Sequence, residues 1–496
     1  MSNSSVYWYP WGEETFRRAK EENKSIFLFI ESTSSNLSAL MQKESFQDKS
    51  VIEILNEHFI SIKINREERP EIEKFYQKVY KLMNRERGSS PLSIFMTDKL
   101  KPFFADGYIS PQAHEEKLGF KELLNVIHTK YATDYQMLTE KGDEVLHYIE
   151  PKEKTIEATR LNINITKTIQ LHTENLLDKE NGGFGTLPKF PNCSTLQLLL
   201  DTYQLEKDEK LLNSIKLTLD KMAFGGLYDH ESGGFFQYTT DEKWLSPNLV
   251  KTTYNNAQLA QLYLRAFHLT QDVAYKKVAL STIEFMLKNM SEKSLFYTIL
   301  NLSENTSTDK RVITSWNAMM ITALFQASTL DDSGSNRYRT IAIESLEALL
   351  NTLYIEKRLY HSTIEKSKPQ TEAFLEDYAY LGEALIEAYQ VTLDEDYLLI
   401  ATELTNRTIE EFYQYGEWNF STKEILVKEE IYDTLYPSSI STLLSLFLSI
   451  SPLVKSDYKH FVFKTLELNS YNLMRQPLSS PKLTHVLLRY LKEDIS

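Results

Sequence analysis

The stretch Gly225–Ala257 contains side chains that could transfer protons or bind a polar ligand. It holds two Gly-Gly pairs, although the whole chain has only 15 glycines. Paired glycines adopt backbone conformations that other residues avoid, so they can hold the side chains between them in a tight turn. An aspartate and a histidine could act there as acid and base, and neighbouring aromatic, amide and lysine side chains could orient a ligand. The candidates are Tyr228, Asp229, His230, Trp244, Lys251, Tyr254 and Asn256. The alternative is a structural hairpin whose aromatic residues pack beneath a helical domain.

Further candidates lie outside this stretch. Asp377 opens an expected helix, and we group it with Asp229 and His230 as the candidate catalytic residues. Each candidate has a structural alternative: a carboxylate can cap a helix, a histidine can bind a carbonyl in a turn, and a tryptophan on a helix can belong to the core. The remaining candidates for ligand contact are Lys189, Trp316, Asn317 and Glu376.

Composition limits the class of protein. A chain of 496 residues is too long for one ordinary core, so two or more domains are expected. The net charge of −14 argues against a nucleic-acid backbone or an anionic membrane as the main partner. The single cysteine, Cys193, excludes an internal disulfide framework and a cysteine-rich metal site, and we expect no metal or other cofactor. No signal peptide or membrane span is recognisable, so we expect a cytoplasmic protein.

The first 135 residues alternate between short apolar runs and helical patterns, and we assign them to one α/β domain. Two buried strands separated by helices, then an antiparallel pair and a final helix, give the order of a thioredoxin-like fold. Residues 136–160 are expected to form a linker. The expected strands are 25–31, 59–64, 92–96 and 101–108, and the main helices are 12–23, 34–43, 70–83 and 115–131.

Residues 161–496 have helical periodicity and an internal repeat. Ala266–Ala279 aligns with Ala388–Ala401, and weaker copies recur at intervals of about sixty residues. This length accommodates six helical hairpins, and closing them into a ring would bury the end repeats against each other. We therefore expect an all-α (α/α)6 toroid, with an open solenoid as the alternative.

Several motifs of the first domain resemble one known family. They are YPWGEE (Tyr9–Glu14), KESFQD (Lys43–Asp48), KINREERPEIE (Lys63–Glu73), SPLSIFMT (Ser90–Thr97) and KPFFADGY (Lys101–Tyr108). They are similar to the thioredoxin-like domain of a widespread family that includes the spermatogenesis-associated thioredoxin-domain proteins and many bacterial relatives. The family has two cysteines after its first strand, where this chain has Ser35 and Ser38. A serine hydroxyl cannot form a mixed disulfide, so we expect a domain without redox activity. The resemblance also implies a cis peptide before Pro91.

The resemblance continues through the second half. GGFGTLPKFPNCSTL (Gly182–Leu196), GGLYDH (Gly225–His230), RVITSWNAMM (Arg311–Met320) and AFLEDYAYL (Ala373–Leu381) resemble segments of the same family. The expected ring is similar to the toroids of the N-acylglucosamine 2-epimerase class and the six-hairpin glycosidases. That similarity implies a carbohydrate-type pocket. However, Asn248, Val250 and Asn255 replace a histidine, a glutamate and an aspartate of the family pattern, which weakens the case for catalysis.

Three hypotheses about function follow. The toroid could bind a sugar or another polar small molecule without turning it over, or it could be a sugar isomerase or epimerase. Alternatively, the protein could be a non-catalytic scaffold that docks a protein partner. A pocket shared by Asp229, His230 and Asp377 would favour the first two hypotheses, whereas a mouth filled by aromatic side chains would favour the scaffold.

Overall fold

The computed structural model describes residues 5–86, 88–114, 117–150, 157–303, 307–330, 336–364 and 367–492. The chain divides into two compact units, residues 1–155 and 156–496. Each unit has a hydrophobic core of its own. Among the described residues, no helix combines the length and the apolar character needed to cross a membrane.

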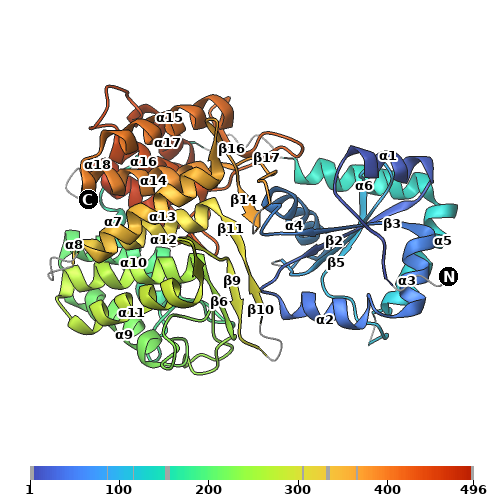
Figure 1. Ribbon diagram of the computed structural model, residues 1–496, viewed down its shortest axis with the longest axis horizontal. Helices are drawn as coiled ribbons and strands as arrows, with labels where there is room; N and C mark the ends of the chain where they lie inside the picture. Colours follow the sequence, from blue (N-terminus) through green and yellow to red (C-terminus); the bar gives the residue numbers. More distant parts are fainter. Residues whose placement is uncertain are drawn as a thin grey trace. The chain divides into compact units, whose positions relative to one another are not determined.

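The N-terminal unit is built on a five-stranded mixed sheet with the order β1-β3-β2-β4-β5. Figure 1 shows this sheet with helices around it. β3 lies parallel to both β1 and β2, whereas β4 is antiparallel to β2 and to β5. β2 is central because its sequence SIFLFIE is apolar on both faces and is buried almost throughout. This is the predicted thioredoxin-like arrangement. The strands are β1 (Trp8–Tyr9), β2 (Ser25–Glu31), β3 (Phe59–Asn65), β4 (Leu92–Met96) and β5 (Pro102–Asp106); the helices are α1 (Glu13–Glu21), α2 (Asn36–Glu44), α3 (Lys49–His58), α4 (Pro70–Asn84), α5 (Phe120–Thr133) and α6 (Tyr135–Ile149).

Helix α6 occupies much of the stretch 136–160 for which the sequence predicts a linker. It packs against β5 and α4, so it belongs to the N-terminal unit. Its buried residues, Leu138, Gly142 and Val145, recur at helical spacing and form the contact face. A Cβ atom at Gly142 would lie only 2.6 Å from the Cβ of Lys101, so the glycine allows the helix to approach closely.

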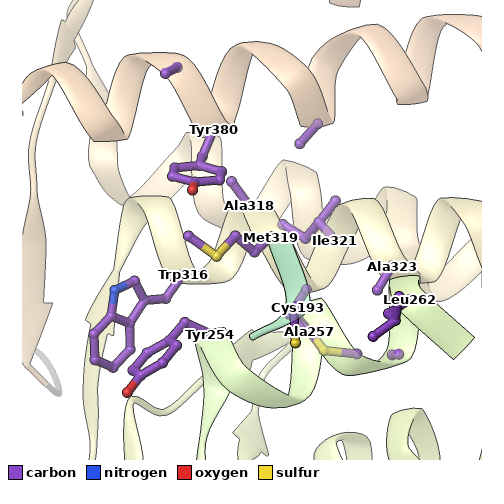
Figure 2. Packing of buried hydrophobic residues seen from close by; sticks show 14 of the residues in the cluster. Cys193, Tyr254, Ala257, Leu262, Trp316, Ala318, Met319, Ile321, Ala323 and Tyr380 are labelled. Atoms are coloured by element: carbon purple, nitrogen blue, oxygen red, sulfur yellow. The ribbon is translucent and has the colours of Figure 1, made fainter. Parts of the chain in front are cut away.

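The C-terminal unit is a closed ring of helical hairpins, as predicted. Twelve helices in its described part alternate between an inner and an outer layer, and each inner helix packs against the next. The last inner helix packs against the first, which closes the ring and rules out the open solenoid. Figure 2 shows part of this packing. The inner helices are α8 (Cys193–Glu206), α10 (Thr253–Thr270), α12 (Thr314–Ser328), α14 (Leu375–Thr392), α16 (Ser439–Ile450) and α18 (Pro481–Leu491); the outer helices are α7 (Ile165–Leu176), α9 (Glu209–Phe224), α11 (Val273–Asn289), α13 (Arg337–Leu353), α15 (Glu395–Phe412) and α17 (Lys459–Arg475).

Short strands decorate the loops between the hairpins. The three-stranded sheet β10-β9-β6 pairs the end of the Gly225–Ala257 stretch with the next long loop. These loops precede the inner helices, so they converge on the end of the ring where those helices begin. The strands are β6 (Val250–Thr252), β7 (Ser291–Glu292), β8 (Leu295–Phe296), β9 (Ile299–Asn301), β10 (Ser307–Asp309), β11 (Arg311–Ile313), β12 (Tyr354–Ile355), β13 (Arg358–Leu359), β14 (Ser362–Ile364), β15 (Tyr413–Gln414), β16 (Glu417–Ser421) and β17 (Val427–Lys428); the short helix η1 is Pro477–Ser479.

Candidate functional site

Asp229 and Lys251, both predicted from the sequence, form an ion pair inside their own loop, in which Lys251 is fully buried and Asp229 is partly buried. The Lys251 ammonium donates to Asp229 Oδ2 at 2.6 Å, to the carbonyl of Gly233 at 2.7 Å and to Ser232 Oγ at 3.1 Å. Burial opposes ionisation of Asp229, but hydrogen bonds from Lys251 and Ser232 outweigh it and hold the pKa of the carboxyl at about 2. Burial lowers the pKa of Lys251, and Asp229 opposes that shift. This ion pair clamps the glycine turn.

The other candidates in or near the glycine turn also have partners within the protein. Nε2 of the exposed His230 donates to the carbonyl of Gly225 at 3.0 Å, and the Tyr228 hydroxyl donates to Ser281. The indole of Trp244 is fully buried and donates to the carbonyl of Asn181. These contacts match the structural alternative that the sequence left open for this stretch. Lys189 likewise donates to Asp178 at 2.8 Å and to the carbonyl of Glu242 at 2.9 Å.

Asn256 and Asn317 hold equivalent positions in successive repeats. Near the start of α10, Asn256 accepts from the backbone N–H of Phe235 at 2.7 Å and donates to the carbonyls of Phe235 and Thr252. Near the start of α12, Asn317 makes the same three bonds to the next copy of the loop. It accepts from the backbone N–H of Phe296 and donates to the carbonyls of Phe296 and Ile313. Each amide already makes three of the four hydrogen bonds that it can form, so these side chains have little capacity left for a ligand.

Asp377 fixes the beginning of α14. Its carboxylate accepts from the backbone N–H of Phe374 at 2.9 Å and of Ser315 at 3.1 Å, and from His361 Nδ1 at 2.8 Å. His361, which the sequence reasoning did not single out, is buried with Asp377 and Glu376, and one ligand atom from each of the three lies within 4.8 Å of the others. A histidine and two carboxylates at this spacing are metal-ligand types. Both oxygens of Asp377, however, already accept hydrogen bonds.

Three aromatic side chains pack together at the end of the ring where the inner helices begin. The rings of Tyr254 and Trp316 pack edge to face with centroids 4.7 Å apart, side by side in Figure 2, and Tyr436 packs on Tyr254 at 5.3 Å. The Tyr436 hydroxyl donates to Glu376 at 3.1 Å. A shared pocket for Asp229, His230 and Asp377 was predicted here, but none of the three lines either of two cavities in the described part of the chain, which measure about 600 and 110 Å³. Among the predicted ligand contacts, Tyr254 lines the smaller of these two cavities.

A larger cavity of about 600 Å³ lies inside the ring and is lined by all six inner helices. It extends to the end of the ring where these helices finish, where the lining residues His268 and Gln390 are exposed. Its wall is rich in amides and charged groups, unlike an ordinary core. The polar lining includes Gln197, Gln258, Gln261, Gln326, Gln390, Arg265, Glu383, Glu387, Lys482, His485 and Arg489.

A histidine–aspartate pair is part of this wall. His485 Nδ1 donates to Asp201 Oδ2 at 2.5 Å, and Arg265 forms an ion pair with the other oxygen of Asp201. Asp201 is fully buried; burial opposes its ionisation, but the charges of His485 and Arg265 hold its pKa at about 2. Burial lowers the pKa of His485, although Asp201 opposes this shift. Because Nδ1 binds Asp201, Nε2 is the nitrogen available to a molecule in the cavity.

Two carboxyl groups lie across the cavity on α14. Glu383 pairs with Lys482 at 3.2 Å, and Glu387 accepts from the side-chain amide of Gln326 at 3.4 Å. Burial raises the pKa of Glu387, and the nearby Glu383 adds to the shift. The cavity therefore contains a paired carboxylate and a carboxyl group that holds its proton more tightly than usual.

The sequence reasoning missed the cavity residues, although a signal was present. Polar residues recur four positions apart on inner helices that are otherwise apolar, and this spacing places them on one face of each helix. The pairs are Gln197 and Asp201, Gln261 and Arg265, Glu383 and Glu387, and His485 and Arg489.

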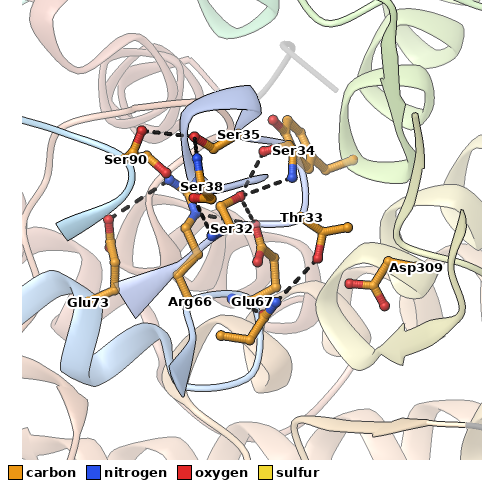
Figure 3. A network of polar contacts seen from close by, with 12 residues as sticks. Ser32, Thr33, Ser34, Ser35, Ser38, Arg66, Glu67, Glu73, Ser90 and Asp309 are labelled. Carbon is orange, nitrogen blue, oxygen red and sulfur yellow. Dashed lines mark hydrogen bonds and ion pairs between the residues drawn. The ribbon is translucent and has the colours of Figure 1, made fainter. Parts of the chain in front are cut away.

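In the N-terminal unit, serines occupy the place of the family's cysteines. Ser35 caps α2: its Oγ accepts from the backbone N–H of Ser38 at 3.2 Å and donates to the carbonyl of Ser90 at 2.8 Å (Figure 3). Ser38 is buried, and its hydroxyl accepts from the backbone of Ser32. The Ser90–Pro91 peptide is cis, as the resemblance implied.

Comparison with known proteins agrees with this architecture. Residues 1–150 match a family model described as "Protein of unknown function, DUF255". Spermatogenesis-associated protein 20 of Homo sapiens is 32% identical over 299 residues, which cover 58% of this chain and 38% of that protein. The chain is thus similar to the spermatogenesis-associated proteins, and its first 150 residues match the family model. An uncharacterised protein of Caenorhabditis elegans is 34% identical over 274 residues, or 54% of this chain and 37% of that protein. The matched part thus spans less than two thirds of either relative.

Solved structures similar to this chain are toroids. Cellobiose 2-epimerase from Spirochaeta thermophila matches with a TM-score of 0.55 and 12% identity over 66% of this chain and 94% of that one. A sugar epimerase from a ruminal bacterium matches with a TM-score of 0.52 and 16% identity over 62% of this chain and 86% of that one. At these identities the likeness establishes the fold alone.

Proposed function

We propose that the toroid binds a sugar or a related polar metabolite in its central cavity. The observation that carries this proposal is the cavity itself, whose volume of about 600 Å³ and many amide and charged side chains suit a small hydrophilic molecule. The amides of Gln197, Gln261 and Gln326 offer the paired donors and acceptors that hydroxyl groups require. Similar toroids in solved structures include proteins named as sugar epimerases. This site replaces the one that the sequence predicted at the opposite end of the ring.

Thermal unfolding of the full chain with a panel of sugars would test the binding. A ligand present at 100 times its Kd should stabilise the fold by about 2.7 kcal/mol and raise Tm measurably. Gln390→Trp places a bulky ring at the exposed rim of the cavity and should abolish this rise. Gln136→Trp, the same change at an exposed position of α6, should leave it intact. If no sugar raises Tm, or if both variants respond like the wild type, the cavity is not a sugar site and the docking scaffold becomes the better hypothesis.

The His485–Asp201 pair favours a second candidate function, that of a sugar isomerase or epimerase. An imidazole whose Nδ1 is held by a buried carboxylate, and whose pKa is lowered by burial, has the arrangement of a general base. Its Nε2 could remove the proton from the carbon beside the carbonyl of a ring-opened sugar. Return of the proton to the opposite face of the resulting enediolate would epimerise that carbon. Return of the proton to the former carbonyl carbon, with the hydroxyl proton passing to the former carbonyl oxygen, would isomerise the sugar. In this hypothesis His485 has the role that the sequence reasoning gave to His230.

Proton transfer can be tested directly in deuterated water. If the wild-type protein is an isomerase or epimerase, it should incorporate deuterium into a sugar at the carbon beside the carbonyl, as measured by NMR. His485→Asn should abolish incorporation, whereas His460→Asn, on exposed α17, should not affect it. If exchange is lost in His230→Asn instead, the catalytic role returns to His230, as the sequence predicted. If the wild type exchanges no sugar proton, binding without turnover is the remaining hypothesis for the cavity.

The N-terminal unit is proposed to lack thiol–disulfide exchange activity. Ser35 and Ser38 stand at the family's cysteine positions, and the chain's one cysteine, Cys193, is buried in the other unit. Burial raises the pKa of the Cys193 thiol to about 12, which disfavours the reactive thiolate. The wild type should not reduce insulin disulfides, whereas Ser35→Cys combined with Ser38→Cys should create a disulfide that dithiothreitol reduces. Insulin reduction by the wild type would contradict the proposal.

A further inference from the structure

Arg489 differs from the other cations of the central cavity in its partners. Arg265 pairs with Asp201, and Lys482 pairs with Glu383. Arg489 donates instead to neutral groups, namely the carbonyl and hydroxyl of Ser445 at 3.3 and 2.9 Å and the hydroxyl of Ser449 at 3.1 Å. Within the part of the chain that the structure describes, no carboxylate lies at ion-pair distance from it.

These bonds hold the guanidinium in place without neutralising it. A guanidinium has five N–H donors, and three bonds to the serines leave two donors for another acceptor. Two N–H groups of one guanidinium match the two oxygens of a carboxylate or phosphate group. The group is also partly enclosed, and burial lowers its pKa while the more distant Glu383 and Asp201 oppose the shift.

Glu387, the neighbouring acid, does not supply a counter-ion for Arg489. Glu387 lines the same cavity, and its pKa is raised by burial, so its proton is retained more readily. An enclosed cation without a counter-ion is costly, and binding an anion would relieve that cost.

We propose that the ligand of the central cavity carries an oxyanion group, a carboxylate or a phosphate, and that Arg489 binds it. The inference rests on the proposed function, because it assigns the charge of the ligand for the same cavity. It narrows the ligand from polar metabolites in general to sugar acids or sugar phosphates. The hydroxyl groups of such a ligand would face the amides, and its anionic group would face the serines of α16.

Isothermal titration of the full chain with matched probes tests this inference. Glucose, glucuronate and glucose 6-phosphate differ in the charged group they carry, and all titrations would use one ionic strength. At least one anionic probe should bind about tenfold more tightly than glucose, because its oxygens would accept charge-assisted hydrogen bonds from the guanidinium. The stronger of the two anions identifies the group as carboxylate or phosphate.

Variants assign the preference to Arg489. Arg489→Gln should reduce the affinity for the preferred anion by about tenfold and leave any glucose binding unchanged. Arg489→Lys should restore part of the affinity, and Arg475→Gln, on exposed α17, should change nothing. Tm without ligand would confirm that each variant is folded. Equal affinity for glucose and both anions, or an anion preference that survives Arg489→Gln, would overturn this inference while leaving the proposed sugar binding intact. Failure of all three probes to bind would count against both.

Discussion

Lys251 and Arg489 are both enclosed cations of the toroid, but their surroundings give them different roles. The oxygen atoms to which Lys251 donates belong to Asp229, Ser232 and Gly233 of its own loop, so its charge is used to hold that loop. Arg489 keeps two N–H donors beyond its serine partners and lines a cavity. At the scale of single residues, a charged group therefore indicates a ligand site only where it faces open volume with donors left over.

The ion pair of Asp229 and Lys251 should dominate the stability of its loop. Asp229→Asn would leave the Lys251 ammonium fully buried without its counter-ion and should lower the free energy of unfolding by about 3 kcal/mol. Adding Lys251→Met removes the unpaired charge and should recover part of the loss. Urea unfolding of the two variants measures both effects. Equal stability of Asp229→Asn and the wild type would contradict the clamp.

The same pair predicts a pH dependence. The pKa of Asp229 is about 2 in the folded protein, below its ordinary value of 3.8. A carboxyl with a lowered folded pKa stabilises the fold above its unfolded pKa, and this contribution is lost as the pH falls from about 4 to about 2. Urea unfolding across this range should show a smaller loss of stability in the double variant than in the wild type. Parallel curves would show that the pair does not contribute.

At the scale of elements, each inner helix performs two tasks along its length. Its first turn holds a loop, as Asn256 does for α10 and Asn317 does for α12. Its later turns line the central cavity, as Arg265 does for α10 and Gln326 does for α12. The candidate site residues chosen from sequence motifs lie mostly in the first turns and the loops. This position explains why they have hydrogen-bond partners within the protein.

Because the two asparagines are equivalent, their removal should have equal consequences. Asn256→Ala and Asn317→Ala each delete three buried hydrogen bonds and leave backbone groups without partners, which should lower the free energy of unfolding by about 2–3 kcal/mol. Asn289→Ala, at the exposed end of α11, should change it by less than about 0.5 kcal/mol. Chemical denaturation measures all three. A large difference between the first two variants would show that the repeats are not equivalent.

The sequence predicted the fold far better than the site, and the reason is physical. Helical periodicity and the repeat of about sixty residues are local signals, so the twelve toroid helices and the thioredoxin-like strand order could be predicted. The cavity instead depends on residues that meet across the ring: Asp201 and His485 are 284 positions apart. Glycine turns stood out in the sequence, but their residues hold loops. The polar residues spaced four apart on the inner helices were not noticed, because they resembled ordinary interruptions of an apolar pattern.

At the scale of the whole molecule, the chain consists of two units with separate cores. The N-terminal core combines residues from the sheet and its helices, and the toroid core runs through all the inner helices. The boundary between the units falls at residue 155. It lies beyond α6, although the sequence placed the end of the first domain at residue 135. This difference determines which fragment of the chain should fold alone.

A fragment of residues 1–150 should unfold cooperatively, because it contains the complete sheet and all the helices that cover it. A fragment of residues 1–135 should be less stable by about 3 kcal/mol or more, since it loses the burial of Leu138 and Val145 and exposes the surface beneath α6. Urea unfolding followed by circular dichroism compares the two. Residues 157–496 should also unfold cooperatively and show a steeper dependence on urea, because the larger toroid exposes more surface on unfolding. Equal stability of the two short fragments would mean that α6 is dispensable, and the linker predicted from the sequence would then be the better description of this segment.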